Sequence, residues 1–300
     1  MDHISKALEK TKSASKKSSQ TPKSVRDWVR PGQGPSSAAE PVRAKQAAPE
    51  EPIATRPIEA DGNVLRSNKI VSAGGDPYIL DRYRLLRTRT LQLMRANQWQ
   101  SLGITSAGAG EGKTLTSINL AMAIAREGVH PVVLLDADIR RPAVANAFGY
   151  NVDVGLPEVL IGEATLEDVA FSVNGEPNLS IIPGKASVQT AKSPELLSSK
   201  AIRDILSSTL TEDTILIVDL PPVLVGDDVI GVAHDLDSML MVVAEGQTDV
   251  DELTRAVELL SSFNLLGTVL NRSTEKVGAT ESYYGYYKDA NDAQEVPQGT

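Results

Sequence analysis

The feature that most constrains this chain is a glycine-rich stretch, SAGAGEGKT, at residues 106–114. It follows an apolar run, SLGITS, and precedes a segment, about 113–127, whose apolar residues recur at helical spacing. Glycines between a strand and a helix let backbone N–H groups curl around an anion, and the helix N-terminus adds the positive end of its dipole. The stretch therefore predicts a phosphate-binding loop.

The loop departs at one position from the general pattern G-x-x-x-x-G-K-[ST], because Ala107 stands where that pattern has glycine. The strand–helix context is unaffected by this departure. Lys113 is expected to reach the β- and γ-phosphates of a nucleotide, and the Thr114 hydroxyl to bind Mg²⁺. The nucleotide-binding residues predicted within the loop are Gly108, Ala109, Gly110, Glu111, Gly112, Lys113, Thr114 and Leu115.

Two further apolar runs end in carboxylates. The run VVLLDAD contains Asp136 and Asp138, and the run ILIVDLPP contains Asp219. Because strand side chains alternate, Asp136 and Asp138 are expected to point to the same face. Mg²⁺ in nucleotide sites takes a few carboxylates together with phosphate oxygens and water. The predicted metal ligands are therefore Thr114 and the three aspartates, although any one strand-end Asp is also an ordinary helix cap.

Strand-like and helix-like segments alternate along the rest of the chain. One helical stripe is predicted from Leu80, Tyr83, Leu86, Thr90 and Leu93. Runs of apolar residues predict strands at 101–106, 131–138, 178–184, 213–221, 238–246 and 265–273. Several of these runs are continuous, which is typical of strands buried on both faces of a parallel sheet. The predicted fold class is α/β, a doubly wound, mostly parallel sheet with helices on both faces and ligands at the carboxyl ends of its strands.

Composition excludes several kinds of site. The chain has no cysteine, which rules out disulfides, thiolate catalysis and cysteine metal sites, and its three histidines are scattered. A net charge of −9 argues against nucleic acid as a bulk partner. No apolar run reaches the roughly 18 residues of a membrane span, and the N-terminus lacks the apolar core of a signal peptide. A cytoplasmic location is therefore expected.

The two ends of the chain differ in composition from the middle. Residues 13–65 are rich in Ser, Pro, Ala and basic side chains and are predicted to be a disordered basic linker. Before it, residues 1–12 have apolar side chains at helical spacing, which fits either a short docking helix or a frayed terminus. A P-loop domain is predicted for 66–280, followed by a flexible tail, 281–300.

The tail contains the stretch SYYGYY, in a chain with only seven tyrosines. A strand is disfavoured because Gly285 interrupts the run and no apolar alternation follows it. An adhesive aromatic patch is one alternative, and a set of hydroxyls presented for modification is the other. A phosphoryl-transfer site earlier in the chain favours modification, and the acceptors would be Tyr283, Tyr284, Tyr286 and Tyr287.

Over roughly residues 70–287 the chain resembles the bacterial tyrosine kinases of capsule and exopolysaccharide synthesis. The matching motifs are SAGAGEGKT, LLDADIRRP, VDLPPVLVGDD, SPELLSS, DRYRLLRT and the tyrosine cluster. DADIRRP is the most specific, since other P-loop ATPases do not need two arginines and a proline there. The opening MDHISKALEK is similar to the start of cytoplasmic tyrosine autokinases found with exosortase-type polysaccharide loci.

The resemblance implies a protein tyrosine autokinase that uses ATP and Mg²⁺. Its catalytic residues would be Lys113, Asp136, Asp138 and Asp219, with Asp138 the first candidate and Asp136 the second for the base that accepts the tyrosine proton. Asn271 matches the family's base-reading asparagine, and Arg272 stands beside it. The tail tyrosines would be the phosphoacceptors.

The resemblance also implies partners. DRYRLLR is similar to the family's E-x-x-R-x-x-R subunit contact, which places Asp81, Arg84 and Arg87 in a homo-oligomer interface; Asp for Glu shortens the acidic arm. A separate membrane polysaccharide copolymerase would act as activator and hold the chain at the inner face of the cell membrane. A cognate tyrosine phosphatase is also expected.

Two other functions compete with the kinase. Partitioning and septum-type positioning ATPases share the general fold, but they usually carry lysine in the first part of the loop, where this chain has Gly108. A nucleotide-dependent scaffold, whose aromatic tail binds an export machinery, is the third alternative.

Overall fold

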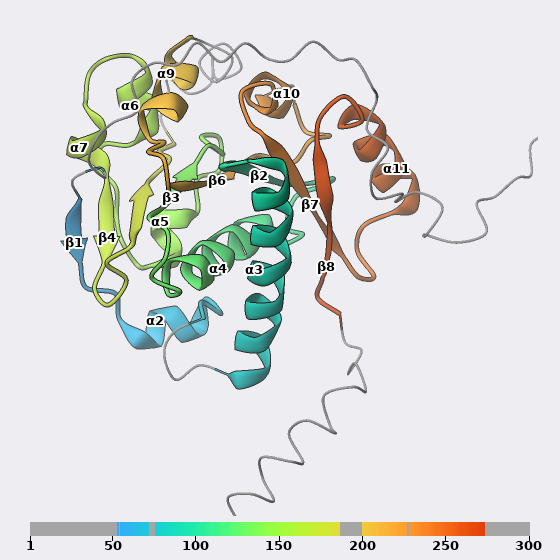
Figure 1. The fold of residues 1–300 in the computed structure, drawn as a ribbon, viewed down its shortest axis with the longest axis horizontal. Coiled ribbons are helices and arrows are strands. Elements are labelled where there is room, and N and C mark those ends of the chain that lie inside the picture. Colours follow the sequence, from blue (N-terminus) through green and yellow to red (C-terminus); the bar gives the residue numbers. More distant parts are fainter. Residues whose placement is uncertain (1–52, 54, 72–75, 187–199, 227, 274–300) are drawn as a thin grey trace, which may run out of the picture. The chain divides into compact units, whose positions relative to one another are not determined.

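The computed structural model describes residues 53, 55–71, 76–186, 200–226 and 228–273, all of which belong to one unit of the chain, Lys45–Thr300. In this part of the chain, eight strands form one sheet in the order β1-β4-β5-β3-β6-β2-β7-β8 (Figure 1). The strands are β1 (Arg56–Ile58), β2 (Ser101–Ser106), β3 (Val132–Asp136), β4 (Phe171–Val173), β5 (Leu179–Ile182), β6 (Ile215–Asp219), β7 (Ser238–Ala244) and β8 (Leu265–Asn271). Neighbouring strands are parallel, except that β4 and β5 are antiparallel.

The central strands are buried on both faces, as their continuous apolar runs predict. In β6, Ile215 and Ile217 enter one apolar core, whereas Leu216 and Val218 enter the other. Strand side chains alternate between faces, so a strand that needs apolar residues at every position must be covered on both sides. The predicted fold class, an α/β doubly wound and mostly parallel sheet, is confirmed.

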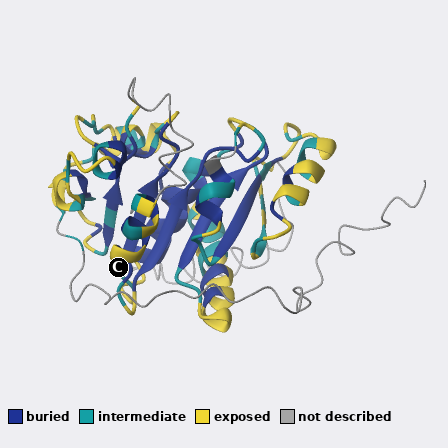
Figure 2. Ribbon diagram, turned by 90° about the horizontal axis from the view of Figure 1, so that it is seen from above, coloured by how far each residue is buried: buried dark blue, intermediate teal, exposed yellow. Residues whose placement is uncertain are grey.

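Helices cover both faces of the sheet. One face is covered by α2 (Gly62–Ser67), α3 (Pro77–Asn97), α4 (Lys113–Ala125) and α5 (Val144–Ala147). The other is covered by α6 (Leu156–Leu160), α7 (Leu166–Val169), α9 (Lys200–Ser208), α10 (Asp228–Ala233) and α11 (Val250–Leu259). Figure 2 shows the strands buried between helices whose outer surfaces are exposed.

The long helix α3 begins where the sequence provides a cap. The Asp76 side chain accepts a hydrogen bond from the backbone N–H of Tyr78 at 2.9 Å, and Pro77 occupies the first helical position. The predicted stripe is right as far as Thr90, which is buried. It is wrong at Leu93, which is 43% exposed, because the buried positions in the last turns are Leu91 and Met94.

The sheet also begins earlier in the chain than expected. Residues 56–58 pair in parallel with β4, and α2 follows them, so the prediction of a disordered linker is wrong for residues 56–65. A three-residue strand whose partner lies far along the chain has no local apolar period that a sequence pattern can detect. The predicted docking helix and the tyrosine tail lie outside the described residues.

We expect Gly103→Ala, in the middle of β2, to lower the free energy of unfolding by about 1–3 kcal/mol through overpacking. A methyl group there would come within 2.7–2.8 Å of Leu220, Met239 and Leu236. Gly62→Ala, at the start of α2, is the matched control, because its methyl would meet its nearest neighbour at 3.6 Å. Urea denaturation measures both; equal stability of the two variants would contradict the packing argument.

Candidate active site

The phosphate-binding loop connects β2 to α4 and needs glycine at two positions. Gly110 and Gly112 have φ angles of +78° and +94°, in the left-handed region that side chains disfavour. At Gly112 a Cβ atom would also lie 2.1 Å from the Nδ2 atom of Asn271. The loop therefore turns tightly into the N-terminus of α4, where backbone N–H groups can face an anion.

Lys113 lies between two carboxylates at the floor of the loop. Its Nζ atom is 2.8 Å from Asp138 Oδ2 and 3.5 Å from Asp219 Oδ2. Burial alone would lower the pKa of Lys113, but the charges of Asp219 and Asp138 raise it above its ordinary value. The lysine therefore stays protonated and is held as a cation in the site.

The first turn of α4 is joined to the end of β6 through Asp219. This carboxylate is fully buried and accepts hydrogen bonds from Thr114 Oγ1 at 2.7 Å and from Ser117 Oγ at 3.0 Å. Burial raises the pKa of Asp219 above its ordinary value, although Lys113 and the two hydroxyls oppose this. Ser117 was missed in the sequence; its spacing of three residues from Thr114 is the signal that places both on one helix face.

Asp136, the last residue of β3, and Asp138, two residues later, have different surroundings. Asp136 is fully buried and accepts hydrogen bonds from the backbone N–H groups of Ala143 and Val144, each at 3.0 Å. Burial, followed by the nearby charge of Asp219, raises the pKa of Asp136 from 3.8 to about 7. Asp138 instead faces Lys113. The two carboxylates do not point the same way because β3 ends at Asp136, where strand alternation stops.

A cavity of about 600 Å³ lies at this carboxyl edge of the sheet. Its walls include the loop from Ala109 to Thr114 apart from Glu111, together with Asp138, Arg140 and Arg141. Pro221, Pro222, Val225 and Gly226 close the side beyond β6. Asp138 therefore reaches the cavity, whereas Asp136 is buried behind it. Both arginines belong to the motif DADIRRP, but no binding or catalytic role was predicted for them from the sequence.

The back of the loop is held by side chains. Asn271 Nδ2 donates to the carbonyl of Glu111 at 2.9 Å, and Arg272 Nη2 donates to the carbonyl of Gly110 at 2.6 Å. The Glu111 carboxylate, 2% exposed, accepts from the N–H of Gly108 at 3.0 Å. Leu115 packs against the apolar core under α4. Asn271 and Arg272 thus contact the loop itself in this structure.

The residues present fit a nucleotide with Mg²⁺. The hydroxyl of Thr114 and the carboxylate of Asp219 lie together, beside the loop N–H groups and Lys113. Among the described residues, no cluster of three or more His, Asp or Glu side chains could hold an ion unaided. Mg²⁺ prefers a few protein ligands completed by phosphate oxygens and water.

The predicted oligomer contact on α3 is partly used within the chain. Arg84 Nη1 pairs with Asp81 Oδ1 at 3.0 Å on the exposed surface. Arg87 turns to α4, where Nη1 donates to the carbonyl of Ala123 at 3.3 Å and Nε lies 3.7 Å from Glu127 Oε2. Asp81 and Arg84 are therefore presented at the surface, whereas Arg87 ties two helices together.

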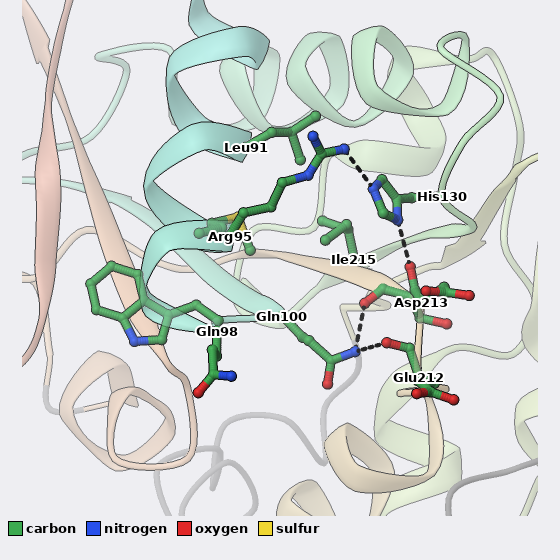
Figure 3. A pocket seen from close by; sticks show the side chains of 11 residues that line it. Leu91, Arg95, Gln98, Gln100, His130, Glu212, Asp213 and Ile215 are labelled. Carbon is green, nitrogen blue, oxygen red and sulfur yellow. Dashed lines mark hydrogen bonds between the residues drawn. The ribbon is translucent and has the colours of Figure 1, made fainter.

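A second cavity, of about 310 Å³, lies at the opposite end of the sheet, where β2 and β6 begin. Figure 3 shows Arg95 and His130 pointing toward each other, with the Arg95 Nη2 atom 3.1 Å from His130 Nε2. His130 Nδ1 is 3.0 Å from the Asp213 carbonyl. Because arginine only donates, Nε2 accepts and Nδ1 carries the proton. These bonds tie the end of α3 to the segment before β6.

Comparison with known proteins defines the family. A model of the ParA family, described as NUBPL iron-transfer P-loop NTPase, matches residues 98–297. The tyrosine-protein kinase YwqD of Bacillus subtilis (strain 168) is 32% identical over 229 residues, which cover 75% of this chain and 93% of YwqD. The chain belongs to the bacterial tyrosine-protein kinase family. It is thus a protein-tyrosine kinase built on a ParA-type P-loop NTPase fold, as its motifs predicted.

Two further relatives support this assignment. The succinoglycan biosynthesis transport protein ExoP of Rhizobium meliloti is 30% identical over 212 residues, which are 69% of the kinase but 27% of ExoP. The solved kinase domain of the Escherichia coli tyrosine kinase ETK aligns with a TM-score of 0.61 and 25% identity, covering 76% of this chain and 91% of that domain. The positioning-ATPase alternative is weaker.

Other predictions about the kinase are not reached by the described residues. The four tail tyrosines and the motif SPELLSS lie outside them. None of the helices that the structure describes is long and apolar enough to cross a membrane.

Asp136 is expected to contribute stability to the nucleotide-free kinase that is lost as pH rises from about 4 to about 7. The folded chain keeps the Asp136 proton up to about pH 7, whereas the unfolded chain loses it near 3.8, so the folded state binds more protons across this window. Asp136→Asn should flatten this part of the curve of unfolding free energy against pH. The control is Glu258→Gln on the exposed surface of α11; an unchanged slope in Asp136→Asn would contradict the raised pKa.

Proposed function

We propose that this kinase is an Mg-ATP-dependent autokinase that phosphorylates Tyr283, Tyr284, Tyr286 and Tyr287 in its own tail. The observation that carries the proposal is the cavity in which the phosphate-binding loop, Lys113 and Asp138 converge. Phosphoryl transfer needs positioning and charge neutralisation more than covalent chemistry, and this cavity offers both. The tyrosine cluster in the same chain supplies acceptors.

Residues of the loop and of the neighbouring strand ends are proposed to hold the nucleotide. The N–H groups at the start of α4 bind the phosphates, and Lys113 neutralises their negative charge. Thr114 and Asp219 are the residues that would hold Mg²⁺, with Asp138 next to them. Mg²⁺, when bound, offsets the charge that develops on the transferred phosphoryl group. Asn271 and Arg272 are proposed to border the base while they support the loop.

Asp138 is the proposed base. A tyrosine hydroxyl has a pKa near 10, so an attacking tyrosine needs a carboxylate to take its proton. Asp138 lines the cavity, whereas both carboxylate oxygens of Asp136 accept bonds from backbone N–H groups. Lys113 pairs with Asp138 at 2.8 Å. Phosphate oxygens compete for the lysine, and its movement toward them leaves Asp138 Oδ2 free to accept the proton, while Oδ1 keeps its bond from the backbone N–H of Arg141.

The cellular role is proposed to be regulation of exopolysaccharide or capsule polymerisation and export. The relative ExoP, a succinoglycan biosynthesis transport protein, supports this setting. The membrane activator is proposed to be a separate polysaccharide copolymerase. That partner would hold the kinase at the inner face of the membrane.

The proposal also includes the assembly of subunits and the removal of phosphate from the tail. Asp81 and Arg84, exposed on α3, are proposed to contact a neighbouring subunit in a homo-oligomer. A cognate tyrosine phosphatase would remove the tail phosphates. Residues 1–12 would dock to the partner or the membrane surface, and the basic linker would connect them to the P-loop domain.

Lys113→Met is expected to reduce tail phosphotyrosine by about a hundredfold or more, because it removes the cation that faces the transferred phosphate. Tryptic mass spectrometry after incubation with Mg-ATP, with and without host membranes, measures phosphate on each tail tyrosine. Lys200→Met is the matched control, since Lys200 lies on the exposed surface of α9 and pairs with Asp204 on the same helix.

Replacement of all four tail tyrosines by phenylalanine should remove most phosphotyrosine while Mg-ATP binding persists. ATP turnover with no phosphotyrosine in the wild type, even with membranes present, would refute the autokinase and indicate a positioning ATPase.

Asp138→Asn is expected to lower kcat for tyrosine phosphorylation by about 10²–10⁴-fold, because it removes the proton acceptor. Mg-ADP affinity should change much less than kcat. Asp136→Asn is the paired variant, and it should lower kcat less, since its carboxylate supports backbone rather than facing the cavity. A larger loss in Asp136→Asn than in Asp138→Asn would assign the base to Asp136.

A further inference from the structure

Three consecutive carbonyl groups of the phosphate-binding loop are held by side chains from the other end of the chain. The donors are an amide, a guanidinium and a second amide, from the loop after β7 and from the end of β8. The pairs are Gln247 Nε2 to Ala109 O (3.2 Å), Arg272 Nη2 to Gly110 O (2.6 Å) and Asn271 Nδ2 to Glu111 O (2.9 Å).

Two of these side chains also bind each other. Arg272 Nη1 donates to Gln247 Oε1 at 2.6 Å, so the pair forms one connected unit, which we call the Gln247–Arg272 clasp. Arg272 has a φ angle of +60°, an uncommon conformation for a residue with a side chain. Such a conformation persists only where surrounding contacts over-determine it, and it is concentrated at functional sites. The contacts that hold Arg272 are its hydrogen bonds to the Gly110 carbonyl and to Gln247.

The clasp determines the direction of the loop's donors. In a planar trans peptide the C=O and N–H bonds point in opposite directions. The carbonyls of Ala109, Gly110 and Glu111 belong to the same peptide planes as the N–H groups of the residues that follow them. When the clasp and Asn271 hold these carbonyls from outside, the N–H groups of Gly110, Glu111 and Gly112 face the other way.

Within the loop itself, side chains bond to Gly108: the Glu111 carboxylate accepts from its N–H, and the Ser106 hydroxyl donates to its carbonyl. Three residues of the loop are glycines, which gain much backbone entropy when they are released. Donors that are already aimed at an anion bind it with less ordering cost than donors that must be arranged on binding. Side chains that fix the three peptide planes beforehand therefore favour nucleotide binding.

We propose that Gln247 and Arg272 are positioning residues that hold the phosphate-binding loop in its anion-binding shape before the nucleotide arrives. The inference rests on the proposed nucleotide site, and it gives Gln247 a role that no sequence motif indicated. It also gives Arg272 a role that does not require direct contact with the nucleotide. If Arg272 acted only through the nucleotide, loss of Gln247 would have little effect.

The test is titration of the full chain with Mg-ADP by isothermal calorimetry. Gln247→Ala and Arg272→Met should each weaken Mg-ADP affinity by about tenfold, as expected for lost hydrogen bonds to a loop carbonyl. The double variant should lose much less than the product of the two, because both act through one clasp. Gln92→Ala and Arg255→Met, exposed on α3 and α11, are the matched controls and should bind like the wild type.

A second readout separates positioning from general destabilisation. Amide hydrogen exchange should become faster in the loop, 107–113, and stay unchanged in β2 and in the later turns of α4. Gln247→Glu keeps the acceptor for Arg272 but sets a carboxylate oxygen against the Ala109 carbonyl, so it should bind Mg-ADP no more tightly than Gln247→Ala.

Wild-type affinity in Gln247→Ala, fully multiplicative losses in the double variant, or faster exchange throughout the domain would each overturn the proposal. So would a wild-type chain that does not bind Mg-ADP. Mg-ADP binding is measured without any phosphate transfer. A wild type that binds Mg-ADP and shows clasp-dependent affinity, yet forms no phosphotyrosine, would therefore contradict the autokinase and leave the clasp standing.

Discussion

The structure depends on one buried charge, the carboxylate of Asp219 at the end of β6. A carboxylate without access to water is costly unless charged and hydrogen-bonding partners surround it. Its partners here, Lys113, Thr114 and Ser117, all lie in the first turns of α4. The need to compensate this charge therefore holds α4 against the sheet and places the phosphate-binding loop at the same point.

The position of β6 explains why this compensation organises the whole site. β6 lies between β2 and β3, and Asp219 stands in register with Ile104 on one side and Asp136 on the other. The loop after β2 and the acidic segment after β3 are thereby brought to the two sides of one carboxylate. A parallel sheet brings such segments together because the carboxyl ends of its strands all lie at one edge.

Much of this arrangement could be predicted from the sequence. The strands that hold the site are long continuous apolar runs, and the loop between β2 and α4 carries a specific glycine pattern, so local signals suffice. Other parts leave no such signal. β1 and β4 are three-residue strands, and Gln247 is a single polar residue in a turn. The different orientations of Asp136 and Asp138 depend on the residue at which β3 ends, and element boundaries are poorly determined by composition.

The clasp has a consequence for the tail, because Arg272 lies only about 11 residues before Tyr283 in the chain. Even fully extended, those residues span about 40 Å, at roughly 3.5 Å each. The first of the proposed acceptors therefore lies within about 40 Å of Arg272, and a tether of that reach gives an effective concentration in the millimolar range. An acceptor supplied in this way needs little affinity of its own, so substrate choice can rest on tether length rather than on recognition of a peptide motif.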